Sequence, residues 1–244
     1  MAHGESLPKS ASNHAAIFAT THWSVVILAG QEHSPGATAA LEKLCRAYWF
    51  PIYAEVRRRG FANADAQDHT QEFFATLLRR NSLAHVGAEK GRFRTFLLAS
   101  LKYFLADQSD ARRAAKRGGG VAPIELDGLE AEQRFALEPA THETPDKAFD
   151  RRWAAALLEQ AFARLAVEQA DKSVFFARLK PLLGREIEPG EYDALAGELG
   201  MASNTIAKNV QRLRLRAREL LLEEAAQTVA AAGDAEKELR ELFG

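Results

Sequence analysis

The sequence predicts an all-α fold in which two helical domains are joined by a flexible linker. Apolar residues recur at spacings of three and four through most of the chain, as on the buried side of an amphipathic helix. We find no stretch with the strict apolar and polar alternation of a half-buried strand. Residues 118–148 lack the helical period and are rich in Gly, Glu and Pro. The predicted parts are listed in chain order: a loose N-terminus at 1–19, a domain at 20–117, a linker at 118–148, a second domain at 149–220 and a helical extension at 221–244.

The overall charge of the chain does not mark a nucleic-acid binder, but its distribution is uneven. The 32 Lys and Arg residues are balanced by 33 Asp and Glu residues, for a formal net charge of −1. Basic residues gather at 90–117 and 208–218, whereas acidic residues gather at 125–150 and in the C-terminal tail. Local basic patches of this kind are where an anionic partner would bind.

Cysteine content and hydropathy indicate a cytoplasmic protein with no membrane partner. The single cysteine, Cys45, cannot form an internal disulfide, and its helical spacing from Leu41, Leu44 and Tyr48 predicts a packing role. No stretch approaches the roughly 18 apolar residues of a membrane-spanning helix. The N-terminus also lacks the basic segment and apolar core of a secretion signal.

Three helices are expected before residue 81. The first begins at Thr21 and would bury Trp23, and the second, 39–59, contains Pro51, which should kink it. The third, 62–80, separates an apolar side from a polar side. The apolar side consists of Ala66, Phe73, Phe74, Leu77 and Leu78. The polar side consists of Gln67, Asp68, Gln71 and Glu72, with Asp65 just before them. Such a row is either a solvated face or a docking surface for a basic partner helix.

A loop at 81–91 precedes a long helix that should run to about Arg117 and that mixes aromatic with basic residues. Single-stranded DNA binds to such mixtures, because unpaired bases stack on rings while Lys and Arg hold the phosphates. We assign Phe93, Leu97, Leu101 and Phe104 to packing. The candidates for contact with DNA are Arg92, Lys102, Tyr103, Arg112, Arg113, Lys116 and Arg117.

Further helices follow the linker. One should begin near Asp150 and bury Trp153 together with the leucines that follow it, and another should cover about 172–183. The last residues of the chain should form two short helices that end in an apolar group. This group consists of Leu239, Leu242 and Phe243.

Residues 192–218 read as two helices joined by a tight turn. Gly200 breaks the first helix, and Ser203 stands where an N-cap would accept the free amides of the second. Ile206, Val210, Leu213 and Ala217 recur at steps of four, three and four, so they should face the core. The opposite side carries donors and acceptors suited to base edges and phosphates. These residues are Asn204, Thr205, Lys208, Gln211 and Arg212.

The alternative for this stretch is an ordinary helical hairpin with a solvated polar side. Arg212, Arg214, Arg216 and Arg218 favour a phosphate-binding role for part of the second helix, although four arginines in seven positions cannot share one face. Leu215 lies among them on the outward side, and we expect another part of the chain to cover it.

Four motifs, in this order and spacing, resemble those of a bacterial RNA polymerase sigma factor of the extracytoplasmic-function type. DAQDHTQEFF at 65–74 is similar to region 2.2, and GRFRTFLLASLKYFLAD at 91–107 is similar to regions 2.3 and 2.4. FDRRWAAALLEQAFARL at 149–165 is similar to the start of region 4, and the two helices at 192–218 are similar to region 4.2. The resemblance covers about residues 20–220.

The resemblance implies partners for each predicted surface. The face formed by Asp65, Gln67, Asp68, Gln71 and Glu72 would bind core RNA polymerase. The loop at 81–91 and the aromatic and basic helix after it would melt the −10 promoter element, and the helix after Ser203 would read the −35 element. The linker would thread through the polymerase, and no bond would be made or broken.

Two departures from the family pattern bear on regulation. Gln67 stands where an acid is usual, and the C-terminal 24 residues exceed the minimal two-domain plan. Sigma factors resembling this subgroup are often associated with Ser/Thr kinases, and a phosphate on Thr70 would supply the missing negative charge. Thr70 lies on the apolar side of its helix, so its modification should require local opening. A kinase or an anti-sigma protein is the expected regulator.

Other classes of function remain open. A free-standing transcriptional regulator would bind duplex DNA through residues 192–218 and use its first half only to dimerise. In an interaction module, Leu215 and the tail would cover the second helix. An enzyme is the least favoured class, because no metal-ligand spacing, nucleophile elbow, kinase or nuclease signature is present. Gly118–Gly120 lack the Lys and Ser/Thr of a phosphate-binding loop. We expect no catalytic residue, no metal and no cofactor.

Overall fold

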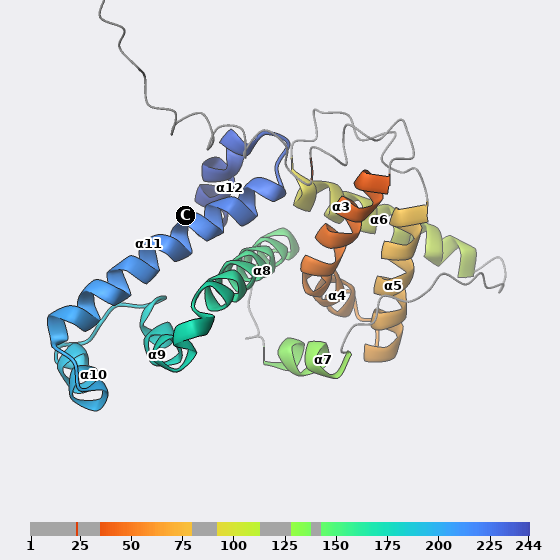
Figure 1. The fold of residues 1–244 in the computed structure, drawn as a ribbon. Helices are drawn as coiled ribbons and strands as arrows, with labels where there is room; N and C mark the ends of the chain where they lie inside the picture. Colours follow the sequence, from red (N-terminus) through yellow and green to blue (C-terminus); the bar gives the residue numbers. More distant parts are fainter. Residues whose placement is uncertain (1–22, 24–34, 80–91, 113–127, 138–142) are drawn as a thin grey trace, which may run out of the picture. The chain divides into compact units, whose positions relative to one another are not determined.

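A computed structural model describes residue 23 and residues 35–79, 92–112, 128–137 and 143–244 of the chain (Figure 1). These residues are mostly helical and contain no strand, and an isolated bridge pairs Arg92 with Val229. The prediction of an all-α chain is therefore confirmed for the part that the structure describes. The chain divides into two compact units, one formed by 1–156 with 225–244 and the other by 157–224.

The division into units differs from the domains that the sequence predicts. The boundaries fall at 156/157 and 224/225, inside two long helices, α8 (Pro145–Glu168) and α11 (Ser203–Gln227). The predicted boundaries lie at 148/149 and 220/221. The last twenty residues of the chain belong to the first unit, although the sequence placed them in a separate extension.

Helices α3 (Pro35–Ala47) and α4 (Trp49–Arg58) replace the single kinked helix predicted at 39–59. They meet at Tyr48, whose φ of −116° and ψ of 25° are not helical. Pro51 is the third residue of α4, in the first turn, where a backbone amide has no partner within the helix. A proline costs little there, so the chain breaks before Pro51 instead of bending at it.

Helices α5 (Asn63–Arg79) and α6 (Phe93–Arg112) complete most of the core of the first unit, with α4 in contact with both. Ala66, Phe73, Phe74 and Leu77 are buried as predicted, and so is Cys45. Trp23 packs on Phe93 and Phe96, with ring centroids 5.0 and 5.2 Å apart, respectively. Residues 21–22 and 24–31 of the first predicted helix lie outside the described residues.

The first half of α8 supplies the remaining part of this core. Its start at Pro145, five residues before the predicted one, suits proline, since the first helical amide has no acceptor. Trp153 is fully buried and stacks on Tyr48 at a centroid distance of 4.0 Å. Aromatic burial of this size contributes several kcal/mol to folding, of the order of 1.5–3 kcal/mol per large side chain.

The predicted linker contains a helix, α7 (Gly128–Ala136), that contacts α4. Arg57 of α4 donates to both carboxylate oxygens of Glu132, at 3.0 and 2.8 Å, and the Tyr53 hydroxyl donates to the same carboxylate at 2.5 Å. Arg57 holds the pKa of Glu132 below its ordinary value. The pKa of Tyr53 is raised, mainly because the phenol is buried and to a smaller extent because it donates to the Glu132 carboxylate. This part of 118–148 is therefore a docked helix instead of a slack chain. Residues 118–127 and 138–142 lie outside the described residues.

The second unit is built from the rest of α8, a short helix α9 (Ser173–Leu179) between two 3-10 turns, α10 (Glu191–Leu199) and most of α11. α9 occupies the place of the helix predicted at 172–183, and the turns at 170–172 and 180–182 flank it. Pro181 lies in the second of these turns and is compatible with its tighter geometry.

The C-terminal tail forms one separate helix, α12 (Ala235–Phe243), where two short ones were predicted. The first of the predicted helices is the end of α11, which continues to Gln227 because Leu220, Ala225 and Ala226 keep one side of it buried. Of the predicted apolar end, Phe243 is 48% exposed. Within the described part of the chain, no helix has both the length and the apolar character needed to cross a membrane.

Candidate nucleic-acid interface

The turn between α10 and α11 is set by Gly200. Its φ of 64° lies in the left-handed region that glycine adopts readily. The amide of Met201 donates to the carbonyl of Ala196 at 3.0 Å, which closes the end of α10 in a Schellman-type arrangement. Two residues later α11 begins, so the predicted pair of helices with a tight turn is present in the second unit.

Ser203 does not act as the predicted N-cap of α11. It is the first residue of that helix, and its hydroxyl donates to the carboxylate of Asp193 in α10. The carbonyl of Ala202 instead accepts the amides of Thr205 and Ile206, at 2.8 and 3.2 Å. The serine therefore ties the two helices to each other.

The apolar side of α11 is buried as its spacing predicts. Ile206 and Val210 have no exposed surface, and Leu213 has 4%. They share a core with residues from α8, α9 and α10, among them Leu165, Phe176 and Ala196. Burial of each large side chain contributes about 1.5–3 kcal/mol relative to exposure. This packing fixes the rotation of α11 about its axis and leaves the opposite side in solvent.

All five residues predicted to read duplex DNA lie on that opposite side, with exposed side chains. They are Asn204, Thr205, Lys208, Gln211 and Arg212. Asn209, which the sequence analysis did not single out, positions one of them. The side-chain Nδ2 of Asn209 donates to the Thr205 carbonyl at 2.8 Å, and its Oδ1 accepts from Nη2 of Arg212 at 2.7 Å. A neutral acceptor orients the guanidinium without removing its charge. The spacing of three residues is the sequence signal that could have identified the pair.

The four arginines near the middle of α11 separate into two kinds. Arg214 donates to the Leu182 carbonyl at 2.7 Å and to the carbonyl of Arg185, so it binds the end of the turn after α9. Arg216 donates to both carboxylate oxygens of Glu168, at 2.9 and 2.7 Å, and to Glu219 at 2.8 Å. The hydrogen bonds that Arg216 donates raise its pKa, and those to Glu168 contribute more than the one to Glu219. These two side chains are structural.

Arg212 and Arg218 are exposed, in contrast to the other two arginines. At about 100° per residue, Arg218 lies on the same side of α11 as Lys208 and Gln211. Because the helix rises about 1.5 Å per residue, Arg218 is some 21 Å from Asn204 along the axis, too far to meet the same base pairs. We therefore add Arg218 to the candidate residues for phosphate contact.

Leu215 is 58% exposed, so the expectation that another part of the chain covers it is wrong among the described residues. The C-terminal tail, which was one segment considered for that role, belongs to the first unit. Leu215 remains on the side of α11 that carries Lys208 and Gln211.

The polar side of α5 is present in the first unit as predicted. Asp65, Asp68 and Glu72 are exposed, whereas Gln67 and Gln71 are partly buried. Nε2 of Gln67 donates to Oδ1 of Asn63 at 2.6 Å. The exposed part of this face is therefore acidic, and the amides lie at its edge.

Thr70 lies on the opposite side of α5 and has no exposed surface. Its hydroxyl donates to the Ala66 carbonyl at 2.7 Å. The side chain is buried, as its place on the apolar side of the helix predicts, and a kinase could reach it only after α5 opens locally.

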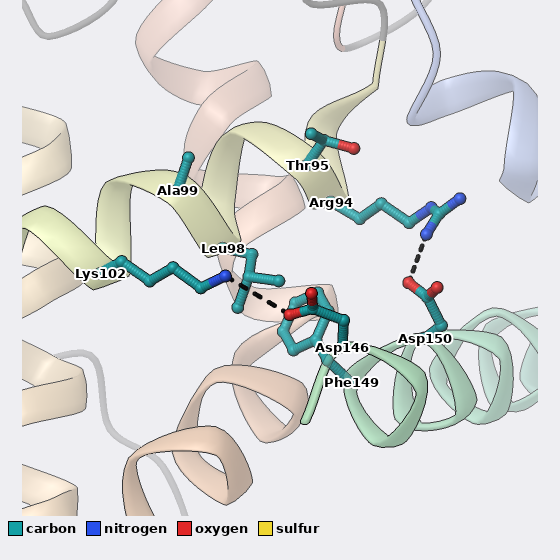
Figure 2. A pocket seen from close by; sticks show the side chains of 8 residues that line it. All are labelled: Arg94, Thr95, Leu98, Ala99, Lys102, Asp146, Phe149 and Asp150. Carbon is teal, nitrogen blue, oxygen red and sulfur yellow. Dashed lines mark hydrogen bonds and ion pairs between the residues drawn. The ribbon is translucent and has the colours of Figure 1, made fainter. Parts of the chain in front are cut away.

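A cavity of about 290 Å³ lies between α6 and the first turns of α8 (Figure 2). Figure 2 shows Arg94 pointing toward Asp150 and Lys102 pointing toward Asp146, with Nζ of Lys102 3.4 Å from the carboxylate. Both cations are paired with acids, so the cavity as it stands does not attract an anion. Tyr103, on the same helix, is 79% exposed and is free to stack on a base.

The other residues predicted to contact the −10 element have different outcomes. Arg92 is not an exposed cation, because it is paired with Glu238 and Glu241 of the C-terminal tail. Arg112 ends α6, but its side chain, like Arg113, Lys116, Arg117 and the loop at 81–91, lies outside what the structure describes.

The described residues define a helical chain whose second unit presents an exposed polar side of α11 next to a glycine-dependent turn. In the same residues no group of three or more His, Cys, Asp or Glu side chains lies together as a metal site would require. Neither family models, nor curated proteins, nor solved structures match the chain.

Proposed function

We propose that the protein is a sigma factor of the extracytoplasmic-function type, which binds core RNA polymerase in the bacterial cytoplasm and directs it to promoters. The observation that carries the proposal is the arrangement of α10 and α11. Buried Ile206 and Val210 set the helix so that Lys208 and Gln211 face solvent together. Amide and ammonium groups on one side of a helix after a tight turn are suited to the major groove. This surface would read the −35 element.

The acidic side of α5 supports the second half of the proposal, binding to the polymerase. Three exposed carboxylates there, Asp65, Asp68 and Glu72, form a local negative patch in a chain of nearly zero net charge. Such a patch is suited to a basic partner helix and would act mainly on the association rate. Exposed Tyr103 on α6 would stack on an unpaired base of the −10 element.

Retention on immobilised core RNA polymerase tests the proposal. We expect the full chain to be retained and the triple variant Asp65→Asn, Asp68→Asn, Glu72→Gln to be retained more weakly, with the loss greatest at low salt. Glu186→Gln is a suitable control, because Glu186 is an exposed acid in the second unit. Equal retention of the triple variant and the control would contradict the role of α5.

Phosphorylation of Thr70 is a further part of the proposal. The added phosphate would restore negative charge near Gln67. Phosphorylation requires α5 to open, since the Thr70 hydroxyl is buried and donates a hydrogen bond to the Ala66 carbonyl. Thr70→Asp and Thr70→Ala should therefore differ in promoter transcription with purified core polymerase, measured at equal amounts of folded protein. Equal activity of the two variants would remove this regulation from the account.

A free-standing helix–turn–helix regulator is the second candidate. The pairing of Arg92 with two carboxylates favours it, because this guanidinium, one of the cations expected to hold the −10 element, is already bound within the protein. Such a regulator would bind duplex DNA through α11 but would not be retained by core polymerase. The retention experiment therefore separates the two candidates.

A further inference from the structure

The segment after α11 is attached to the beginning of α6 by its backbone. The amide of Phe93 donates to the carbonyl of Thr228 at 2.8 Å, and Arg92 forms an antiparallel bridge with Val229. Thr228 and Val229 are both buried. Since the two backbone segments pair directly, the tail has one defined position on the first unit, and α12 follows from it.

α12 brings a buried carboxylate between two arginines. Oε1 of Glu238 accepts from Nε of Arg94 at 2.6 Å, and Oε2 lies 3.0 Å from Nε of Arg92. The Glu238 side chain is 1% exposed and the Arg94 side chain 10%. A carboxylate buried this deeply is tolerated only when it is paired, so Glu238 belongs to the structure of this unit.

Glu241 is held differently, at the rim of the same cluster. It accepts hydrogen bonds from both Nη groups of Arg92, the one from Nη2 at 2.6 Å, and its carboxylate lies 3.5 Å from Nη2 of Arg94. Its side chain is 43% exposed, and that of Arg92 is 23% exposed. Glu241 is therefore the replaceable partner of the outward side of Arg92.

The cluster carries a net negative charge. Arg94 also donates to Asp150 of α8, so two guanidinium groups face three carboxylates, those of Glu238, Glu241 and Asp150. A polyanion gains nothing from Arg92 while this arrangement holds. Without Glu241, the two Nη groups of Arg92 would be open to solvent.

We propose that Arg92 and Arg94 form an anion-binding site that the C-terminal helix occupies through Glu238 and Glu241, and that the phosphodiester backbone of DNA competes with Glu241 for Arg92. A guanidinium binds a carboxylate and a phosphate with the same pair of parallel hydrogen bonds, so one can replace the other. The choice of DNA as the competitor rests on the proposed function. The tail then keeps the start of α6 from binding DNA until it is displaced.

Binding of a fluorescently labelled single-stranded oligonucleotide to the full chain, measured by anisotropy without polymerase, tests this proposal. Glu241→Ala should bind about twofold to fivefold more tightly than the wild type at low salt, the range expected for releasing one partly exposed ion pair. Its salt dependence should steepen by about 0.7, the value for one additional phosphate contact on a single strand.

Two variants control the measurement. Glu236→Ala removes the same charge from an exposed position of α12, and it should leave the affinity close to that of the wild type. Adding Arg92→Gln to Glu241→Ala should abolish the gain, because the gain is assigned to Arg92. If thermal melting shows that Glu241→Ala is unfolded, Glu241→Gln takes its place, since it keeps the size of the side chain.

The inference is overturned if the Glu241 variant binds no more tightly than Glu236→Ala, or if the gain persists without Arg92. Failure of the proposed function has a different signature, because it would show as loss of retention on core polymerase. A chain that is retained but shows no Glu241 effect keeps its proposed function and loses this inference. A chain that is not retained but shows the effect has the anion site without the polymerase role.

Discussion

Arg57 of α4 holds both carboxylate oxygens of Glu132 in α7, with Nε 3.0 Å from Oε2 and Nη2 2.8 Å from Oε1. The two side chains are 20% and 29% exposed. This pair joins residues 75 positions apart and attaches to α4 the helix α7, which lies wholly within the predicted linker.

Glu132→Ala should release α7 from α4. The variant loses the two hydrogen bonds from Arg57 and the one from Tyr53, and hydrogen bonds to a charged group contribute about 1.5–3 kcal/mol each when buried, less at partial exposure. We expect a loss of about 1–3 kcal/mol in the free energy of unfolding, measured in urea. Amides of 131–137 should also exchange faster with deuterium. Gln133→Ala, an exposed change in the same helix, should alter neither quantity.

Leu213 and Leu215 are a matched pair of residues for testing the rotation of α11 about its axis. Leu213 is 4% exposed in the core of the second unit, whereas Leu215 is 58% exposed. Leu213→Ala should cost about 2–5 kcal/mol of unfolding free energy, the usual range for a buried leucine. Leu215→Ala should stay within about 0.5 kcal/mol. Similar losses in the two denaturation curves would mean that α11 is rotated from the position described.

Variants of Arg218 and Arg216 distinguish an arginine that contacts DNA from one that stabilises the fold. Arg218→Ala should weaken binding to duplex DNA and lower the slope of log affinity against log salt by about 1. Arg216→Ala should leave that slope nearly unchanged, because Glu168 and Glu219 already occupy its guanidinium. It should lower stability instead. A reduced slope for Arg216→Ala and an unchanged one for Arg218→Ala would reverse the assignment.

Acid should loosen the C-terminal helix through Glu241. Hydrogen bonds from Arg92 lower the pKa of this carboxyl from 4.5 to about 2. A group with a folded pKa below its unfolded one stabilises the fold above the unfolded value, and this contribution is lost as pH falls from about 4.5 toward 2. The thermal midpoint of the wild type should therefore fall more steeply over this window than that of Glu241→Ala. Parallel pH curves would show that Glu241 is not bound to Arg92 in solution.

Local periodicity was sufficient to predict the helical cores. Phe73 and Phe74 in α5 and Ile206 and Val210 in α11 are buried as expected, because spacing along one helix decides which side faces the core. The exposure of Lys208 and Gln211 follows from the same periodicity. For these residues the information lies within a few turns of a single helix.

Pairings between distant segments could not be predicted in this way. Arg92 looks like a free cation in the sequence, but its partner Glu241 is 149 residues further along the chain. The same is true of α7, which is anchored by a side chain of α4. A charge pattern does not reveal which cations are neutralised, and for that reason Arg92 was assigned to DNA. Residues 118–148 were assigned to a linker because they lack the helical period and are rich in Gly, Glu and Pro.

Transcription initiation by purified core RNA polymerase tests the central claim most directly. The chain and the core enzyme are combined with a library of promoter sequences, and the start sites are mapped by sequencing the transcripts. The account predicts start sites that appear only when the chain is added and that share sequence elements at −35 and −10. It also predicts that a variant with alanine at both Lys208 and Gln211 loses them. Start sites that are the same with and without the chain would contradict the assignment as a sigma factor.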